Sequence, residues 1–280
     1  MHAGHNETYP CTGLMRIKLD AHPMIRCGAE PMITLSVLEL WKRVRNTLLG
    51  RAIEAGIYPD ALNNATRAYI VETIRHMGPD APVLCHKQPT TFQHLSTLGQ
   101  LFPTAKFIHM VRDGRGAVAS SINRHLLPNN YFQRSLDGWQ GMVLQIIKDC
   151  EQLGPNHCIH VRYESLILQT EQEMRRVLNF IGVPWDPIVL HHETIKDQLT
   201  NLNTYEPSTV QFLKSVHNNS LAAWSLPSSP IPVDVLNKSC ETVKLLKLLN
   251  YCPTKGYIPN YADVPSDNPD MSKILELARK

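Results

Sequence analysis

The stretch KFIHMVRDGRGAVASSINR, residues 106–124, contains the change of pattern that decides the fold. It begins as a short apolar strand, breaks after Asp113, and continues as a helix of small residues. In an open α/β sheet, ligands bind where strands pass into helix N-termini, whose free N–H groups attract anions. Arg112 at the strand end, with Ser120 and Arg124 on the helix, forms a candidate phosphate site. An ordinary capped turn is the alternative.

Strands and helices alternate on both sides of this unit. Apolar runs predict further strands over residues 81–87 and 158–163. Helical periodicity predicts helices over 14–21, 32–55, 59–77, 91–101, 136–152, 169–181 and 233–249. The alternation predicts an α/β fold with a parallel sheet flanked by helices, and it places Lys87 and Arg112 at one edge of that sheet.

The composition is that of a globular α/β protein. A chain of 280 residues can bury a full core, and 43% hydrophobic with 19% charged residues is an ordinary balance. The net charge of +3 is too small to indicate a nucleic-acid partner, and no apolar run is long enough to span a membrane. We expect a single domain over residues 1–280, with a loop-rich segment at 225–280, where prolines are frequent.

Several stretches together resemble sulfotransferases that use 3′-phosphoadenylyl sulfate (PAPS), and most closely the protein-tyrosine sulfotransferases. Residues 106–124 are similar to the 3′-phosphate-binding motif of that family. The other matching stretches are Leu14-Met15-Arg16, Leu19-Asp20-Ala21-His22-Pro23, Ile25-Arg26-Cys27-Gly28, Leu101-Phe102-Pro103-Thr104-Ala105-Lys106-Phe107, Val183-Pro184-Trp185 and Leu190-His191-His192-Glu193. The resemblance covers most of the chain. It implies the P-loop-like sulfotransferase architecture and transfer of a sulfuryl group from PAPS to tyrosine hydroxyls of secreted or membrane proteins.

The chemistry implied by this resemblance needs a base for the acceptor hydroxyl and a cation at the leaving oxygen, and it requires no metal. Glu30 matches the family's catalytic glutamate, and Lys87 matches its transition-state lysine. The family's Ser-x-Ser, which includes a catalytic serine, falls on Asn201 and Asn203. From the residues alone, an acidic residue at a helix start is the favoured explanation of Glu30. Lys87 is equally explained as a solvent-facing strand end.

The resemblance also implies contacts to PAPS. Arg112 and Ser120 match the ligands of the 3′-phosphate, while Arg124 and Tyr163 match further nucleotide contacts. A core tyrosine is the alternative reading of Tyr163. A polar segment similar to the family's nucleotide-covering loop contains Glu206, Ser208, Thr209, Gln211 and Lys214.

The chain departs from the family before its first matching helix. The family has an apolar strand and a Pro-Arg-Ser-Gly-Thr-Thr loop around the phosphosulfate, whereas residues 8–13 read TYPCTG. Thr12 matches that loop, and Gly13 offers an N–H. Two family arginines for the acidic peptide fall on Met32 and Ser36. Two explanations stay open: a truncated N-terminus, which also lacks the signal-anchor, or a loss of activity.

The seven cysteines bear on the cellular compartment. The resemblance implies the disulfides Cys27–Cys85 and Cys150–Cys158, whereas without it unpaired buried thiols are favoured. It also implies the Golgi lumen, an oxidising compartment. Four Asn-x-Ser/Thr sequons fit a glycoprotein, at Asn6, Asn64, Asn218 and Asn237.

Three functions stay open at this stage. The first is a protein-tyrosine sulfotransferase that acts on acidic, tyrosine-containing proteins. The second is a catalytically inactive family member that binds nucleotide or a partner protein. The third is a sulfotransferase for a carbohydrate or small molecule. The oligomeric state is undetermined, with a homodimer as one candidate.

Overall fold

A computed structural model describes residues 12–128, 130–198, 220–254, 256, 258–264 and 271–278. The chain divides into two units, which are described separately. Unit 1 comprises Met1–Thr12, Lys106–Trp185 and Ser215–Lys280, and unit 2 comprises Gly13–Ala105 and Asp186–Lys214. The single domain expected over residues 1–280 stays a prediction.

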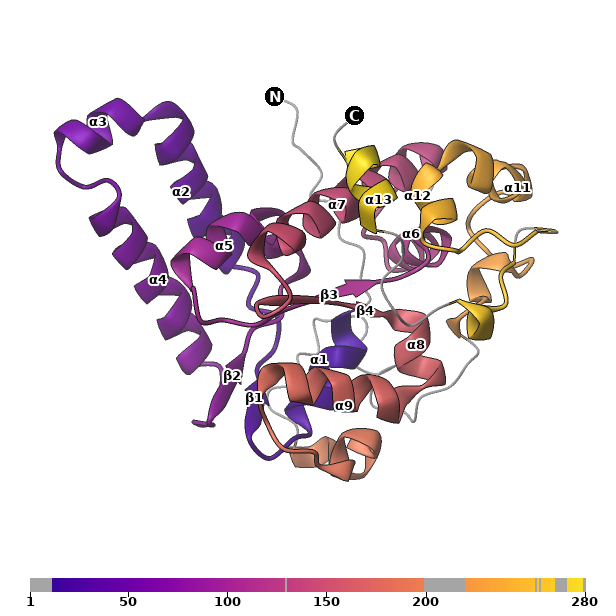
Figure 1. The fold of residues 1–280 in the computed structure, drawn as a ribbon, viewed down its shortest axis with the longest axis horizontal. Helices are drawn as coiled ribbons and strands as arrows, with labels where there is room; N and C mark the ends of the chain where they lie inside the picture. The colour runs from indigo at the N-terminus through magenta and orange to yellow at the C-terminus, as the bar shows by residue number, and fades with distance from the viewer. Residues whose placement is uncertain are drawn as a thin grey trace. The chain divides into compact units, whose positions relative to one another are not determined.

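Unit 2 is built on the parallel strand pair β1 (Ile25–Cys27) and β2 (Val83–Cys85), in which Cys27 lies opposite Cys85. Its helices are α1 (Thr12–Asp20), α2 (Thr34–Thr47), α3 (Leu49–Glu54), α4 (Asp60–Arg75), η1 (Pro89–His94), α5 (Leu95–Leu101), η2 (Pro187–Leu190) and η3 (His192–Gln198). Figure 1 shows α2 and α4 side by side as a hairpin, with α3 at its far end.

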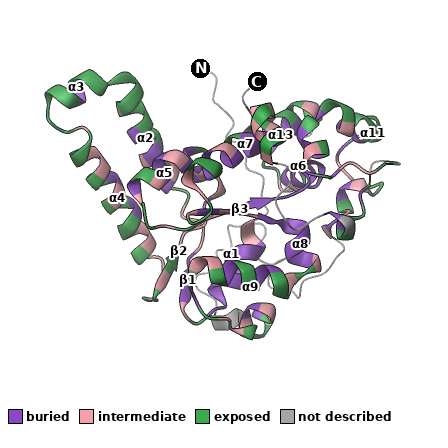
Figure 2. Ribbon diagram, in the orientation of Figure 1, coloured by how far each residue is buried: buried purple, intermediate pink, exposed green. Residues whose placement is uncertain are grey.

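The α2–α4 hairpin is amphipathic. Leu38 and Trp41 are spaced three residues apart on α2 and are both buried, as is Ile70 on α4. The Trp41 indole Nε1 donates a hydrogen bond to Asn63 Oδ1 at 2.8 Å, which satisfies its polar atom. Figure 2 shows the opposite face of each helix exposed.

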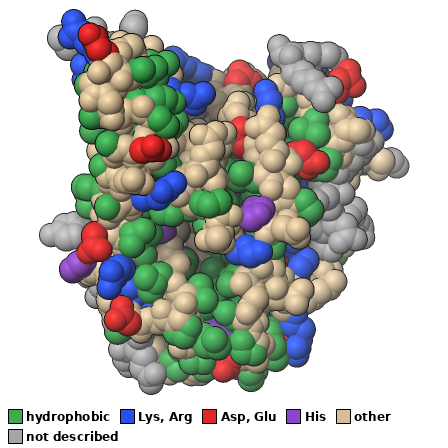
Figure 3. Space-filling view, turned by 60° about the vertical axis from the view of Figure 1, so that its left-hand side comes forward, with side chains coloured by type: hydrophobic (Ala, Val, Ile, Leu, Met, Phe, Trp, Pro, Cys, Tyr) green, Lys and Arg blue, Asp and Glu red, His purple; other side chains and the backbone are tan. Residues whose placement is uncertain are grey.

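Large apolar side chains also remain exposed on unit 2. They include Met32, which is 60% exposed, Leu40 and Ile53. Figure 3, which turns the left-hand side of Figure 1 forward, shows hydrophobic side chains at the surface of that side, between charged ones. Singly exposed apolar side chains of this kind are common on protein surfaces.

Unit 1 is built on a second parallel pair, β3 (Phe107–Val111) and β4 (Cys158–Arg162). Its helices are α6 (Gly114–Asn123), α7 (Phe132–Leu153), α8 (Tyr163–Leu168), α9 (Thr170–Ile181), η5 (Ala223–Ser225), α11 (Val233–Thr242), α12 (Lys244–Leu248), η6 (Tyr261–Asp263) and α13 (Met271–Ala278). The crossover through α6 and α7 is the helical connection that parallel strands require. Val118, Trp139 and Val161 are buried in its core.

The predicted parallel α/β architecture is confirmed, with differences in detail. The helix predicted over 32–55 divides at Leu48, and the one over 233–249 divides at Val243, whose backbone is extended. Tyr163, predicted as the last residue of a strand, is the first residue of α8. The segment 225–280, expected to be loop-rich, also contains α13.

Three disulfides join the described cysteines. Cys27–Cys85 and Cys150–Cys158, both implied by the resemblance, are confirmed. The third, Cys240–Cys252, was not predicted. Within the described ranges, no helix is both long and apolar enough to cross a membrane.

Candidate active site

Unit 2 brings Glu30 and Lys87 together. Lys87 Nζ donates to Glu30 Oε2 at 2.6 Å, and the side chains of Lys87 and Glu30 are 10% and 13% exposed. Glu30 lies three residues after β1 and Lys87 two residues after β2. Because the two strands are parallel, both residues leave the same end of the pair. A carboxylate and an ammonium group therefore share one nearly buried position.

Four interactions fix the end of β1 next to this ion pair. The disulfide joins Cys27 to Cys85. Arg16 on α1 donates through Nη2 to the Cys27 carbonyl at 3.0 Å and through Nε to the Gly28 carbonyl at 3.2 Å. Asp20 Oδ1 accepts from the Cys27 N–H at 2.6 Å. Helix α1 thus holds the segment that leads to Glu30.

Close packing makes glycine necessary at position 28. A Cβ atom there would lie 2.5 Å from Met77 Cβ, a distance that real Cβ contacts essentially never reach. Gly28 therefore permits the chain to pass Met77 on its way from β1 to Glu30.

A polar network that the sequence did not predict lies beside Lys87. The Thr34 hydroxyl donates to Gln88 Oε1, and His86 Nε2 lies 3.1 Å from Thr34 Oγ1. Because the hydroxyl proton is used by Gln88, His86 Nε2 carries the proton and donates to Thr34. Burial, with a smaller contribution from the Lys87 charge, lowers the pKa of His86 to about 4. The imidazole is therefore neutral at pH 7. The one feature of the sequence that pointed to His86 is its position directly before Lys87.

Further candidates lie at or just before the starts of α1 and α2. Thr12 and Gly13 are the first residues of α1, where free N–H groups and the helix dipole favour an anion. Met32 is exposed and has a φ of 59°, in the left-handed region that a methionine rarely adopts. Ser36 lies in the first turn of α2 and is exposed.

Unit 1 brings Arg112 and Tyr163 together, each at the end of a strand. The Arg112 guanidinium lies 4.5 Å from the centroid of the Tyr163 ring, and its Nη2 donates to the Ser220 carbonyl at 3.0 Å. The Tyr163 hydroxyl is 3.3 Å from Ser220 Oγ. Ser220 was not predicted, because it is distant in sequence from both partners.

Further candidate nucleotide-binding residues lie on α6, the helix that follows Arg112, and directly after it. A Cβ atom at Gly116 would lie 3.1 Å from Arg112 Nε, so glycine permits the guanidinium to lie against the helix. Ser120 follows Gly116 by four residues and shares its face of α6, and Arg124 follows Ser120 by four residues, directly after the helix ends. Both are half-buried. Arg112 and Ser120 therefore lie toward the same side of α6.

Five further predicted residues lie outside the described residues: Asn201, Asn203, Ser208, Thr209 and Lys214. Glu206 and Gln211 lie outside them as well. Among the described residues, no group of three or more His, Cys, Asp or Glu side chains is arranged to hold a metal ion.

Residues 11–187 match the model of the sulfotransferase family. Over 275 residues the chain is 34% identical to protein-tyrosine sulfotransferase A of Caenorhabditis elegans, which covers 92% of this chain and 71% of that protein. It is 36% identical to human protein-tyrosine sulfotransferase 1, covering 96% of this chain and 72% of that protein. This chain belongs to the protein-tyrosine sulfotransferase family.

Other relatives of this sulfotransferase are consistent with the assignment. The protein-tyrosine sulfotransferase of Drosophila melanogaster is 36% identical over 86% of this chain, which spans only half the length of that relative. Two solved structures have the same fold at 17% identity. The sulfotransferase domain of the Synechococcus PCC 7002 olefin synthase has a TM-score of 0.55 and covers 86% of this chain and 92% of its own. The sulfotransferase domain from the curacin biosynthetic pathway has a TM-score of 0.56, with 87% and 95% covered.

Proposed function

We propose that this sulfotransferase moves a sulfuryl group from PAPS to tyrosine hydroxyls of secreted or membrane proteins. The observation that carries the proposal is the 2.6 Å contact between Glu30 and Lys87. A base and a cation in one nearly buried position are the two groups that the transfer requires. Its curated relatives, which bear the name of protein-tyrosine sulfotransferases, supply the acceptor class.

In the proposed mechanism, Glu30 accepts the proton of the tyrosine hydroxyl as its oxygen bonds to sulfur. Lys87 stabilises the negative charge that develops on the bridging oxygen as the sulfur–oxygen bond breaks, and adenosine 3′,5′-bisphosphate (PAP) leaves with the bonding electrons. A compact ammonium group suits this contact with a single atom. The neutral His86 adds no competing positive charge at pH 7, because its pKa is about 4.

The nucleotide is assigned to the residues at the ends of β3 and β4. Arg112 supplies a planar guanidinium for the 3′-phosphate, with Ser120 on the same side of α6. Tyr163, whose ring already contacts Arg112, orients that guanidinium. Thr12 and Gly13, at the start of α1, are the residues proposed to face the 5′-phosphosulfate.

The acceptor is proposed to be an acidic, tyrosine-containing segment, and the compartment is proposed to be the Golgi lumen. Three disulfides among the described cysteines support an oxidising environment. Met32 and Ser36 stand where the family has arginines, so they supply no positive charge for acidic side chains.

The test uses the full chain, produced through the secretory pathway, with labelled PAPS. An acidic tyrosine peptide, its Tyr→Phe version and a glycan acceptor are offered in parallel. We expect label on the tyrosine peptide alone. Transfer to the glycan instead would select a carbohydrate sulfotransferase. Binding of PAP without transfer to either acceptor would indicate an inactive member, for which the changed residues 8–13 are the specific reason.

A further inference from the structure

A buried ion pair directly follows Arg112 in unit 1. Arg115 Nη2 lies 2.6 Å from Asp113 Oδ2, and its Nε donates to Oδ1 at 2.9 Å. The two side chains are 0% and 1% exposed. Burying two charges is costly unless other hydrogen bonds satisfy the remaining atoms of both groups. The other partners of the pair therefore identify the segment with which it folds.

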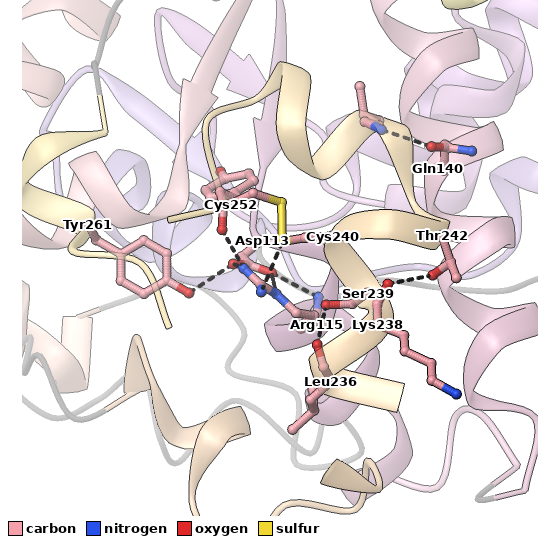
Figure 4. Close-up of a disulfide and its surroundings, with 12 residues drawn as sticks. Asp113, Arg115, Gln140, Leu236, Lys238, Ser239, Cys240, Thr242, Cys252 and Tyr261 are labelled. Atoms are coloured by element: carbon pink, nitrogen blue, oxygen red, sulfur yellow. Dashed lines mark hydrogen bonds and ion pairs between the residues drawn. A yellow bond between two sulfur atoms is a disulfide. The ribbon is translucent and has the colours of Figure 1, made fainter. Parts of the chain in front are cut away.

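Those partners lie more than a hundred residues further along the chain. Arg115 Nη2 donates to the Tyr251 carbonyl at 2.6 Å, and the Tyr261 hydroxyl donates to Asp113 Oδ2 at 3.0 Å. Trp224 Nε1 in turn donates to the Tyr261 oxygen at 2.9 Å. Figure 4 shows the Tyr261 hydroxyl pointing toward the Asp113 carboxylate. The ion pair is thus completed by groups of the C-terminal part of the chain.

The Cys240–Cys252 disulfide, which was not predicted, restrains the Tyr251 carbonyl that accepts from Arg115. Cys252 directly follows Tyr251, and the Cys240–Cys252 bond attaches it to α11. Arg115 Nη1 also lies 3.8 Å from Cys240 Sγ, within reach of a weak hydrogen bond to sulfur. Figure 4 shows the disulfide beside the paired side chains of Asp113 and Arg115. The cross-link therefore limits how far the Tyr251 carbonyl can move from Arg115.

Glu164 at the start of α8 closes the cluster from another side. Its Oε1 accepts from the Asp113 N–H at 2.9 Å, and its Oε2 accepts from the Tyr251 hydroxyl at 2.9 Å. The backbone N–H of Asp113 is hydrogen-bonded to Glu164, and its carboxylate is bound by Arg115 and Tyr261. These contacts restrain the turn between β3 and α6. A ligand-binding side chain on such a turn is pre-organised, which saves ordering free energy on binding.

We propose that the Cys240–Cys252 disulfide and Tyr261 are positioning residues for nucleotide binding. They hold the Asp113–Arg115 pair and, through it, the turn that presents Arg112 to a 3′-phosphate. This inference rests on the proposed function, in which Arg112 is the 3′-phosphate ligand. In this proposal Tyr261 and the disulfide act through their contacts with Asp113 and Arg115, and not by touching the nucleotide.

The experiment measures the dissociation constants (Kd) of PAP and of AMP, which lacks the 3′-phosphate, for the full chain by calorimetry. We expect Tyr261→Phe and the double variant Cys240→Ser/Cys252→Ser each to weaken PAP binding about fivefold, a typical size for coupling through residues that do not touch the ligand. AMP binding is expected to stay unchanged. A merely structural role would lower the fraction of binding-competent protein without changing the ratio of the two constants.

Two variants serve as matched controls. Tyr131→Phe removes a hydroxyl from an exposed tyrosine of the same unit, and Cys150→Ser/Cys158→Ser removes the disulfide at the start of β4. Both are expected to keep the wild-type ratio. The proposal is overturned if Tyr261→Phe also keeps it, or if the control disulfide variant changes it equally. A wild-type protein that does not prefer PAP to AMP would instead overturn the 3′-phosphate site itself, and with it this proposal.

Discussion

The candidate site residues differ in how far their positions follow from the sequence. Glu30, Lys87 and Arg112 follow recognisable strand ends, so their types and places were predictable. The positions of Thr34, Gln88 and Ser220 in the site were not predictable. A Thr, Gln or Ser takes part in a site only through hydrogen-bond partners that the fold brings close to it. His86 shows the same limit, since its lowered pKa comes mainly from burial. The predicted roles of all these residues stay predictions.

The first residue-scale prediction concerns the base. Glu30→Gln keeps an oxygen that accepts from Lys87 but cannot take a proton from the acceptor. We expect the transfer rate to fall by about a hundredfold or more, with PAP affinity unchanged. Rate measurements with labelled PAPS and calorimetry with PAP check the two parts separately. A variant that retains the full rate would show that Glu30 is not the base.

The second prediction separates nucleotide binding from chemistry. Arg112→Ala removes a charge-assisted partner of the 3′-phosphate, so PAP affinity should fall by about tenfold or more. AMP affinity should change little. Arg176→Ala is the control, because this arginine lies in the same unit but pairs with Glu173 on α9. Equal losses of PAP affinity in both variants would contradict a specific phosphate contact at Arg112.

At the scale of elements, long periodic segments were predictable and short ones were not. Strand β1 has only three residues, and its central Arg26 is buried because its guanidinium donates to carbonyls at the end of α4 and beyond, including that of Ile74 at 2.6 Å. An arginine at that position gives no strand signal. The break at Val243 has no glycine or proline beside it, so tertiary packing decides it.

Gly182 was predicted to end a helix, and its φ of 87° confirms that it ends α9 in a left-handed conformation. Gly182→Ala should therefore lower the free energy of unfolding by about 1 kcal/mol. Gly141→Ala is the matched control: Gly141 lies inside α7 with open space around its Cβ position, so alanine there should raise stability by up to about 1 kcal/mol. Urea unfolding measures both. The same sign for both variants would contradict the backbone argument.

At the scale of the whole molecule, the architecture and two disulfides were predictable because the motif residues and the resemblance extend over most of the chain. The third disulfide and the buried cluster at Arg115 were not. They join residues 113–115 to residues 240–261, and nothing in either segment alone indicates the other. Long-range polar contacts of this kind depend on the completed fold.

Buried histidines give the folded molecule a pH dependence. His109 Nδ1 and His160 Nδ1 lie 3.0 Å apart across β3 and β4. Burial lowers the pKa of His160 to about 4, with contributions from the charges of Arg176 and Arg162. Burial, together with His160, lowers the pKa of His109 well below its usual value. Histidines in the unfolded chain have a pKa near ~6.5. Between about pH 6.5 and pH 4 the unfolded chain therefore binds more protons than the folded chain.

Because the unfolded state binds more protons, stability should fall as the pH drops through about 6.5 toward 4, and it should be fully present above that range. We expect His160 alone to contribute about 2 kcal/mol to the loss between pH 7 and pH 5. Urea unfolding across this range measures the slope, and His160→Gln should make it shallower. His76→Gln is the control, since that side chain is 80% exposed and its removal should leave the slope unchanged. A His160→Gln protein with the wild-type slope would show that the pair does not set the acid sensitivity of the fold.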